Sequence, residues 1–188
     1  RPPRSTLFPY TTLFRSKGEN RDRFIESYVE KNRSEAGIIY TATRKEAERI
    51  SSRLSQKGIA AGCYHGGMDD EERDRQQDLF LNDEISVMTA TSALGMGIDK
   101  SNIRYVIHAQ IPKNMESYYQ EAGRAGRDGL DSECILLFSP QDIRLQRFLI
   151  EQSTEDEDIR AQDVKKLRQM VDFCHTEGCL ERFILSYF

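Results

Sequence analysis

Short apolar runs alternate along the chain with longer stretches in which apolar residues recur every three or four positions. The short runs are typical of buried strands, and the longer period is typical of amphipathic helices. Strands are expected at residues 36–40, 59–64, 85–90, 103–108 and 134–138, and helices at 20–32, 44–57, 69–82, 114–126 and 140–150. This alternation predicts an α/β fold with a parallel sheet covered by helices on both faces.

Beyond the last predicted strand and its helix, the pattern becomes purely helical. Residues 151–163 carry six acidic residues against one arginine and are either a solvated linker or the start of a helix. Two amphipathic stretches follow at 164–174 and 180–188. We therefore expect one domain over residues 17–150 and the truncated start of a helical module over 151–188.

Residues 1–16 (RPPRSTLFPYTTLFRS) fit neither period. In one reading frame, codons for these residues spell a common sequencing-library adapter. We interpret them as a translated adapter joined to the gene, exclude them from the fold and predict that they are disordered; a natural proline-rich tail is the alternative. Excluding them removes Arg1, Arg4 and Arg15 and takes the formal net charge from −4 to −7.

Composition excludes several classes of protein. With 38% hydrophobic and 31% charged residues, the chain is globular, and no apolar run approaches the ~20 residues of a membrane span. Four cysteines in 188 residues do not make a disulfide scaffold and indicate reduced thiols or part of a metal site. Because the net charge is negative, any nucleic-acid contact must be a local groove rather than a basic surface overall.

Polar and small residues follow the predicted strands, and ligands of open parallel sheets bind beyond the carboxyl ends of the strands. The candidate contacts to a nucleic-acid backbone are Thr41, Thr43, Arg44, His65, Thr89, Thr91 and Ser92, with Arg44 and Lys100 as the nearby cations. Hydroxyls and amides suit phosphates, which they contact without reading the base sequence. For any one of these residues alone, capping or turn chemistry is the alternative, and His65 before two glycines is either a turn residue or a contact.

A glycine pair follows the third strand. Gly95, Gly97 and Asp99 resemble half of a dinucleotide fingerprint whose third glycine is missing. The glycines allow a backbone to approach a ligand closely, and Asp99 either accepts a hydrogen bond from a ribose hydroxyl or caps a turn.

The most informative segment is YYQEAGRAGRDG at residues 118–129. In a continuous helix, Gln120, Arg124 and Arg127 fall within about 60° of one another and form a polar stripe. Two interior glycines cost a helix about 1 kcal/mol each, which favours access for a partner over stability. Two guanidinium groups and an amide suit a transferring γ-phosphate; a solvated helix face is the alternative.

The sequence contains no G-x-x-x-x-G-K-[ST] phosphate cradle and no Asp-Glu pair after an apolar strand to hold Mg²⁺. The chain thus carries candidate arginine fingers without a nucleotide pocket.

Four strings together resemble the second motor lobe of superfamily 2 helicases, specifically the RecQ family of DNA helicases. They are GIIY at 37–40, YHGGM at 64–68, ATSALGMGIDK at 90–100 and SYYQEAGRAGRDG at 117–129. Gly97 stands where the related DEAD-box RNA helicases have arginine.

The resemblance implies a RecA-like lobe from a cytoplasmic, nucleoid-associated 3′–5′ helicase of bacterial DNA repair and recombination. It implies that Gln120, Arg124 and Arg127 face ATP and Mg²⁺ held by a first motor lobe in cis. Arg127 is the main finger, Arg124 its neighbour, and the stretch from Thr89 to Asp99 couples ATP to movement on single-stranded and duplex DNA. No membrane partner is implied.

The resemblance also implies a zinc-binding helical module that begins after residue 150. Cys179 matches the position of its first Zn²⁺ ligand, with the other ligands outside this sequence; taken alone, Cys179 reads as a buried free thiol. Two other functions stay open. One is a dinucleotide-dependent enzyme that uses Gly95 and Gly97, and the other is a stand-alone nucleic-acid-binding module without motor activity.

Overall fold

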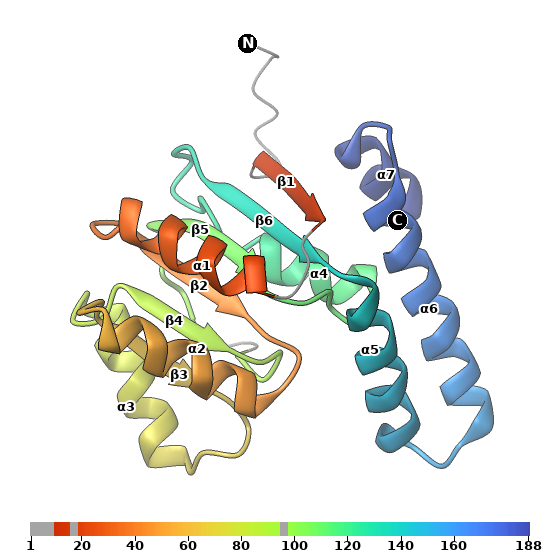
Figure 1. Cartoon of the computed structure of the whole chain (residues 1–188), viewed down its shortest axis with the longest axis horizontal. Coiled ribbons are helices and arrows are strands. Elements are labelled where there is room, and N and C mark those ends of the chain that lie inside the picture. The colour runs from red at the N-terminus through yellow and green to blue at the C-terminus, as the bar shows by residue number, and fades with distance from the viewer. Residues whose placement is uncertain (1–9, 16–18, 95–97) are drawn as a thin grey trace.

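The computed structural model describes residues 10–15, 19–94 and 98–188. The strands are β1 (Tyr10–Arg15), β2 (Ala36–Tyr40), β3 (Ala61–Tyr64), β4 (Val87–Ala90), β5 (Ile103–His108) and β6 (Glu133–Phe138). The helices are α1 (Glu19–Lys31), α2 (Arg44–Gln56), α3 (Asp70–Leu81), α4 (Met115–Ala122), α5 (Pro140–Ser153), α6 (Glu157–His175) and α7 (Leu180–Tyr187). The predicted α/β fold is confirmed, and only helices follow β6 (Figure 1).

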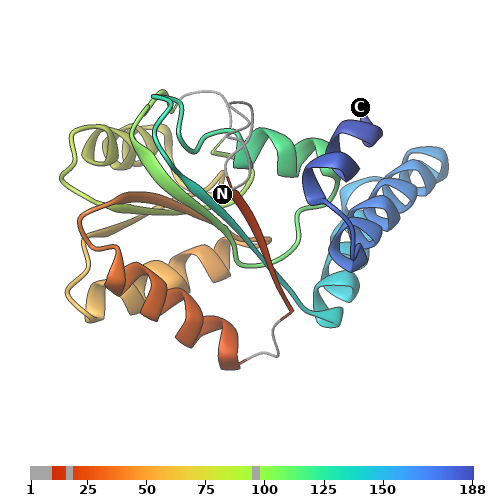
Figure 2. The ribbon, with the colours of Figure 1, turned by 90° about the horizontal axis from the view of Figure 1, so that it is seen from above.

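All strand pairs are parallel, and the sheet has the order β1-β6-β5-β2-β4-β3. Helices α1 and α2 cover one face, and α3 and α4 cover the other (Figure 2). Because successive strand residues point to opposite faces, the sheet separates two apolar cores. Ile39 and Tyr105 pack in the core under α1 and α2, whereas Ile38, Met88 and Phe173 belong to the core under α3, α4 and α6.

Five helices begin at a polar residue whose side chain accepts a backbone N–H of the first turn. These residues are Thr43 (α2), Asp69 (α3), Asn114 (α4), Ser139 (α5) and Asp156 (α6). Such caps satisfy amides that have no partner within the helix. The cap of α6 resolves the ambiguity of the acidic segment, which is the end of α5, a short turn and the start of α6.

The edge strand β1 differs from the sequence expectation, because disorder was predicted for residues 1–16. Tyr10–Arg15 pairs in parallel with β6 along its whole length, and Thr12 donates a hydrogen bond to Glu133 at 3.4 Å. The physical reason is that an edge strand presents unpaired N–H and C=O groups, which an extended segment satisfies with its backbone alone. Order at these residues therefore depends little on their sequence.

The helical module packs against α4. Helices α5 and α6 form an antiparallel pair beside the sheet, and α7 folds back toward α4 (Figure 1). Glu116 of α4 accepts a hydrogen bond from the Tyr187 hydroxyl at 3.0 Å and pairs with Lys166 at 3.1 Å. Among the described residues, no helix is both long and apolar enough to cross a membrane.

Close packing on the face of the sheet covered by α1 and α2 leaves no room for a side chain at Gly37. A Cβ atom at Gly37 in β2 would lie 2.0 Å from the ring of Tyr105 in β5. That ring is 1% exposed and meets the ring of Tyr28 edge to face, with centroids 5.2 Å apart. The tyrosine therefore fills the volume that a larger residue would need.

We expect Gly37→Ala to lower the free energy of unfolding by about 3 kcal/mol, the upper end of the usual cost of overpacking a core. Urea unfolding followed by circular dichroism measures the change. Gly66→Ala is the matched control, because its Cβ meets only the Cβ of Ala93 at 3.7 Å. Equal urea midpoints for the two variants would contradict the close packing at Gly37.

Candidate functional site

Four of the described strands, β2, β3, β4 and β5, end at the same level of the sheet, and β6 continues for two residues beyond it, to Phe138. Tyr40 is paired with Ala90 on one side and with His108 on the other. Ala90 is in turn paired with Tyr64, and His108 with Leu136. The segments after these residues leave the sheet along one edge, which confirms the predicted geometry of the strand ends. Individual residues differ, however, in what they offer to a ligand.

The loops after β2, β3 and β4 converge at this edge. A Cβ at Gly67 would lie 2.7 Å from Nη1 of Arg44, so the arginine lies directly against the glycine backbone. A Cβ at Gly66 would touch the Cβ of Ala93 at 3.7 Å. Glycine thus allows the loops after β2 and β3 to approach closely and fixes the position of Arg44.

Four of the predicted backbone contacts are accessible. Arg44 and Ser92 are exposed, and Thr43 and Thr91 are half-buried. Arg44 lies in the first turn of α2, where the helix dipole adds to its positive charge. The exposed Lys45 beside it was missed by the sequence analysis, although its position at a predicted helix start was a usable signal.

In two other predicted contacts, Thr41 and Thr89, the hydroxyl forms hydrogen bonds to backbone carbonyls of the protein itself. Thr89 is fully buried, and its hydroxyl lies 2.8 Å from the carbonyl oxygen of Ala47. Thr41 is 6% exposed, and its hydroxyl donates to the carbonyl of Thr43 at 3.0 Å while its amide donates to Ala90. The structure therefore does not bring the hydroxyls of Thr41 and Thr89 to the ligand-facing surface.

The ring of His65 forms one hydrogen bond within its own loop and one to helix α2. Its Nδ1 accepts the amide of Gly67 at 3.2 Å, and its Nε2 lies 2.9 Å from Oε1 of Glu48 in α2. Since Nδ1 accepts, Nε2 carries the proton and donates to Glu48. Glu48 lies 17 residues upstream of His65 in the sequence and approaches the ring only in the fold.

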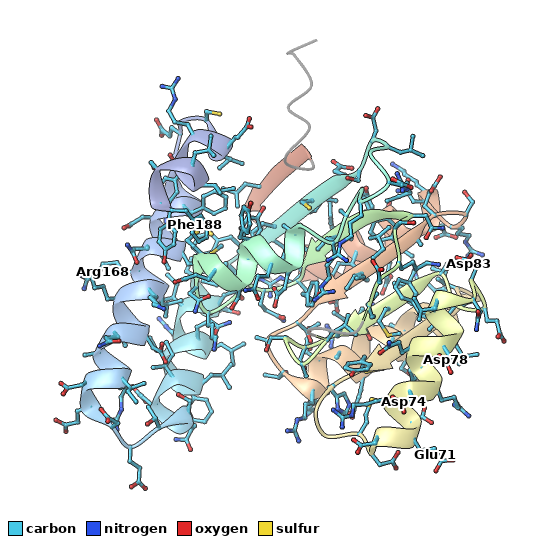
Figure 3. The ribbon with its side chains drawn as sticks, turned by 180° about the vertical axis from the view of Figure 1, so that it is seen from behind. Glu71, Asp74, Asp78, Asp83, Arg168 and Phe188 are labelled. Atoms are coloured by element: carbon cyan, nitrogen blue, oxygen red, sulfur yellow. The ribbon has the colours of Figure 1, made fainter. Side chains whose placement is uncertain are left out.

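Lys100 does not lie near the strand-end edge, contrary to expectation. It is 5% exposed, and its Nζ donates to Asp83 at 2.6 Å, 5.4 Å from the ring centroid of Phe80. Asp83 precedes β4, so the pair lies at the opposite, amino end of the sheet. The exposed Glu71, Asp74 and Asp78 lie along the outer surface of α3 and make this helix unfavourable for a polyanion (Figure 3).

The arginine-rich segment is a turn rather than a helical stripe. Helix α4 ends at Ala122, and the following residues 123–129, which we call the arginine turn, run through successive turns. Gly126 and Gly129 have φ angles of +67° and +78°, which a side chain disfavours. The backbone conformation thus requires glycine at positions 126 and 129, whereas Gly123, with a φ of −66°, ends α4 without such a requirement.

The turn places its two arginines differently. Arg124 is 9% exposed and donates from Nη1 to the carbonyl of Ile98 at 3.4 Å. Burial raises the pKa of the nearby Tyr40 hydroxyl, and the charge of Arg124 opposes this rise. Arg127 is 41% exposed along its side chain and pairs with the exposed Asp99 at 3.3 Å. Arg127 therefore presents its guanidinium to a partner, whereas Arg124 ties the arginine turn to the segment before β5.

Two predicted cofactor contacts, Gly95 and Gly97, lie outside the described residues. Asp99 is described, and its side chain is 94% exposed. Gln120 is exposed in the last turn of α4. Gln120, Asp99 and Arg127 thus remain accessible to an incoming ligand.

Cys179 occupies the N-cap position of α7 and is exposed, where the sequence alone predicted a buried thiol. Cys174 is buried at the end of α6. In the described part of the chain, no group of three or more His, Cys, Asp or Glu side chains is placed to hold a metal ion. The assignment of Cys179 as a zinc ligand stays a prediction.

Sequence comparison identifies two domain families in the chain. The helicase conserved C-terminal domain matches residues 20–129, and the RecQ zinc-binding domain matches residues 140–188. The chain is 73% identical over 172 residues to the ATP-dependent DNA helicase RecQ of Bacillus subtilis (strain 168), covering 92% of this chain and 29% of the relative. It is 46% identical over 151 residues to the mouse bifunctional 3′-5′ exonuclease/ATP-dependent helicase WRN, covering 80% of this chain and 11% of that protein.

Solved structures share the fold. A DEAD box protein from the hyperthermophile Methanococcus jannaschii superposes with a TM-score of 0.62 at 26% identity, over 77% of this chain and 39% of that one. Dbp5 of S. cerevisiae bound to RNA and ADP BeF3 gives a TM-score of 0.65 at 19% identity, over 86% of this chain and 46% of that one. The latter likeness supports the fold alone.

We expect phenylglyoxal, which modifies exposed arginines, to label Arg127 several-fold faster than Arg124 in the native chain. The reason is the difference in exposure, and peptide mass spectrometry of a time course measures both rates. Arg44, which is exposed, serves as the positive control. Equal rates for the two arginines would contradict the buried position of Arg124.

Proposed function

We propose that this chain, which belongs to the RecQ family of helicases through its helicase C-terminal domain, is the second motor lobe of an ATP-dependent 3′–5′ DNA helicase. It spans between about a tenth and a third of the length of its curated relatives, so the motor activity is proposed for a longer protein that also contains a first lobe. The observation that carries the proposal is the exposed Arg127, which pairs with the more exposed Asp99 at 3.3 Å.

Arg127 acts on ATP that the first lobe binds together with Mg²⁺, which supplies charge neutralisation at the phosphates. The guanidinium leaves Asp99 and donates to the γ-phosphate oxygens, where charge develops during transfer. An exposed ion pair is worth at most about 1 kcal/mol, so exchanging Asp99 for a phosphate costs little. Gln120 adds a neutral donor from the preceding turn.

The strand-end edge contacts the DNA backbone. Arg44 and Lys45 face the phosphates from the start of α2, and Ser92 with Thr91 approaches from the loop after β4. The same loop leads to Ile98, whose carbonyl is bound by Arg124, so the DNA-facing and ATP-facing segments share one connection. Movement of either segment is thereby transmitted to the other.

The intact protein acts in DNA repair and recombination in the bacterial cytoplasm, associated with the nucleoid. It is a hydrolase of ATP and an isomerase that separates the strands of duplex DNA. Its similarity to bacterial RecQ supports this setting. The match to the RecQ zinc-binding domain supports Zn²⁺ bound by Cys179 together with ligands beyond this sequence. A stand-alone binding module is not favoured, because the relatives are motor enzymes by name.

In the intact enzyme, Arg127→Ala should leave ATP binding largely in place and lower turnover by roughly 10³–10⁵, the usual cost of losing an arginine finger. A DNA-stimulated phosphate-release assay measures turnover, and a fluorescent nucleotide measures binding. The 188-residue chain alone should show no ATPase activity, since it has no phosphate cradle. Near-normal turnover in Arg127→Ala would mean that another residue is the arginine finger. DNA-stimulated ATP hydrolysis by the 188-residue chain would contradict the expectation that this chain holds only part of the ATPase site.

The chain should bind single-stranded DNA weakly, with a slope of about −1 to −2 in log K against log[salt], because one to three phosphates at roughly 0.7 each are neutralised. Arg44→Ala should make the slope shallower by about 0.7. Arg168→Ala on the exposed surface of α6 is the matched control and should change nothing (Figure 3). Fluorescence anisotropy across a salt series gives the slopes. A slope steeper than about −4 would reveal a different, more basic binding surface.

A further inference from the structure

We propose that His108 is a positioning residue for the arginine turn, through its hydrogen bond to Glu121. The proposal rests on the proposed function, because its consequence for turnover requires Arg127 to act on ATP. His108 ends β5 and is 1% exposed, and it lies at the base of the cavity that Thr41, Ala42 and Ser92 also line. Its contribution is made through the backbone that carries the arginines.

One hydrogen bond and two aromatic rings hold the His108 ring. Its Nε2 lies 2.8 Å from Oε2 of Glu121, which is itself 8% exposed. Tyr40 stacks against the ring with centroids 5.4 Å apart and planes 19° apart, and Tyr118 packs on it at 5.1 Å. Tyr118 in turn packs against Phe173 of α6 at 5.2 Å. The imidazole thus has one orientation, and it gives Glu121 one position.

Glu121 lies in the last turn of α4, two residues before the arginine turn. The amide of Arg124 donates to the carbonyl of Glu121 at 3.3 Å, so a backbone hydrogen bond joins the turn to this residue. Rotation of the last turn of α4 would move Arg124 away from Ile98. It would also shift Arg127, which lies six residues after Glu121 in the chain.

The same strand holds the far end of the arginine turn. The amide of Gly126 donates to the carbonyl of Ile103, the first residue of β5, at 2.9 Å. Arg104 of β5 forms an ion pair with Asp128. Strand β5 therefore holds both ends of the arginine turn, through His108 at one end and through Ile103 and Arg104 at the other.

Stability alone does not account for a buried imidazole and carboxylate. Replacing such a pair by apolar side chains of similar volume is often neutral or stabilising, because two polar groups no longer lose their hydration. Apolar contacts lack direction, however, and leave a helix end free to rotate. A hydrogen bond between a clamped ring and Glu121 fixes that rotation, which is the property that a precisely placed guanidinium needs.

Hydrogen exchange on this 188-residue chain tests the positioning directly. In His108→Ala and Glu121→Ala, the amides of residues 123–128 should exchange on the order of tenfold faster. The reason is that the arginine turn can then open without first breaking the hydrogen bond between His108 and Glu121. Glu121→Gln, whose amide oxygen still accepts from Nε2, should remain close to the parent chain. Phe80→Leu in the buried face of α3 is the destabilised control and should leave the turn protected. Unchanged exchange of the turn in both alanine variants overturns the proposal; if His108→Ala does not fold, Glu121→Ala and Glu121→Gln decide it.

Steady-state ATPase assays in the longer enzyme test the consequence. His108→Ala should lower kcat on the order of 10²-fold with KM for ATP nearly unchanged, since displacement by about 1 Å costs that much. Glu121→Gln should recover most of the rate, and Phe80→Leu should retain the parent kcat. If the parent enzyme shows no DNA-stimulated ATPase, the proposed function fails while the exchange result stands. If Arg127→Ala is inactive but His108→Ala turns over normally, the positioning role alone fails.

Discussion

The parallel hydrogen-bond ladder that pairs Tyr40 with both Ala90 and His108 fixes the height at which the strands end. A slip of one residue in any strand would exchange its two faces and place the side chains of each core in the other, where their shapes do not fit. The register is therefore enforced by burial on two sides at once. Because it is enforced, the polar loops beyond these residues meet at one edge without any interaction of their own to bring them together.

Much of the fold followed from periodicity. The strands β2 to β6 and the helices that alternate with them were predicted, most clearly for β2, β4 and β6, because both faces of the sheet are buried there, which gives short apolar runs. The arginine turn was mistaken for helix because Gly123 and Gly126 look like accessible helix positions in sequence, whereas Gly126 has a positive φ that a helix does not contain. Pairings such as His65 with Glu48 could not be inferred, since their members are distant in the chain and meet only through the packing of α2.

Basic residues that occupy similar positions in the sequence differ in whether the fold exposes or buries them. Arg44 and Lys100 each border a strand-end motif in sequence, yet only Arg44 is exposed there, while Lys100 is buried against Asp83. Arg124 and Arg127 are three residues apart, yet one is buried and the other is exposed. Sequence patterns locate the chemistry of such a site to within a loop, whereas the assignment of individual charges requires the tertiary packing.

Strand β1 protects the outer edge of β6, and it does so almost entirely with backbone bonds. Its segment belongs to the sixteen residues that we interpret as foreign to the gene. Removing them would leave β6, which is rich in Ile and Leu, as an open edge of the sheet. Such an edge is a template for pairing with another chain, so we expect the shortened chain to self-associate more readily in concentrated solution than the chain that contains β1.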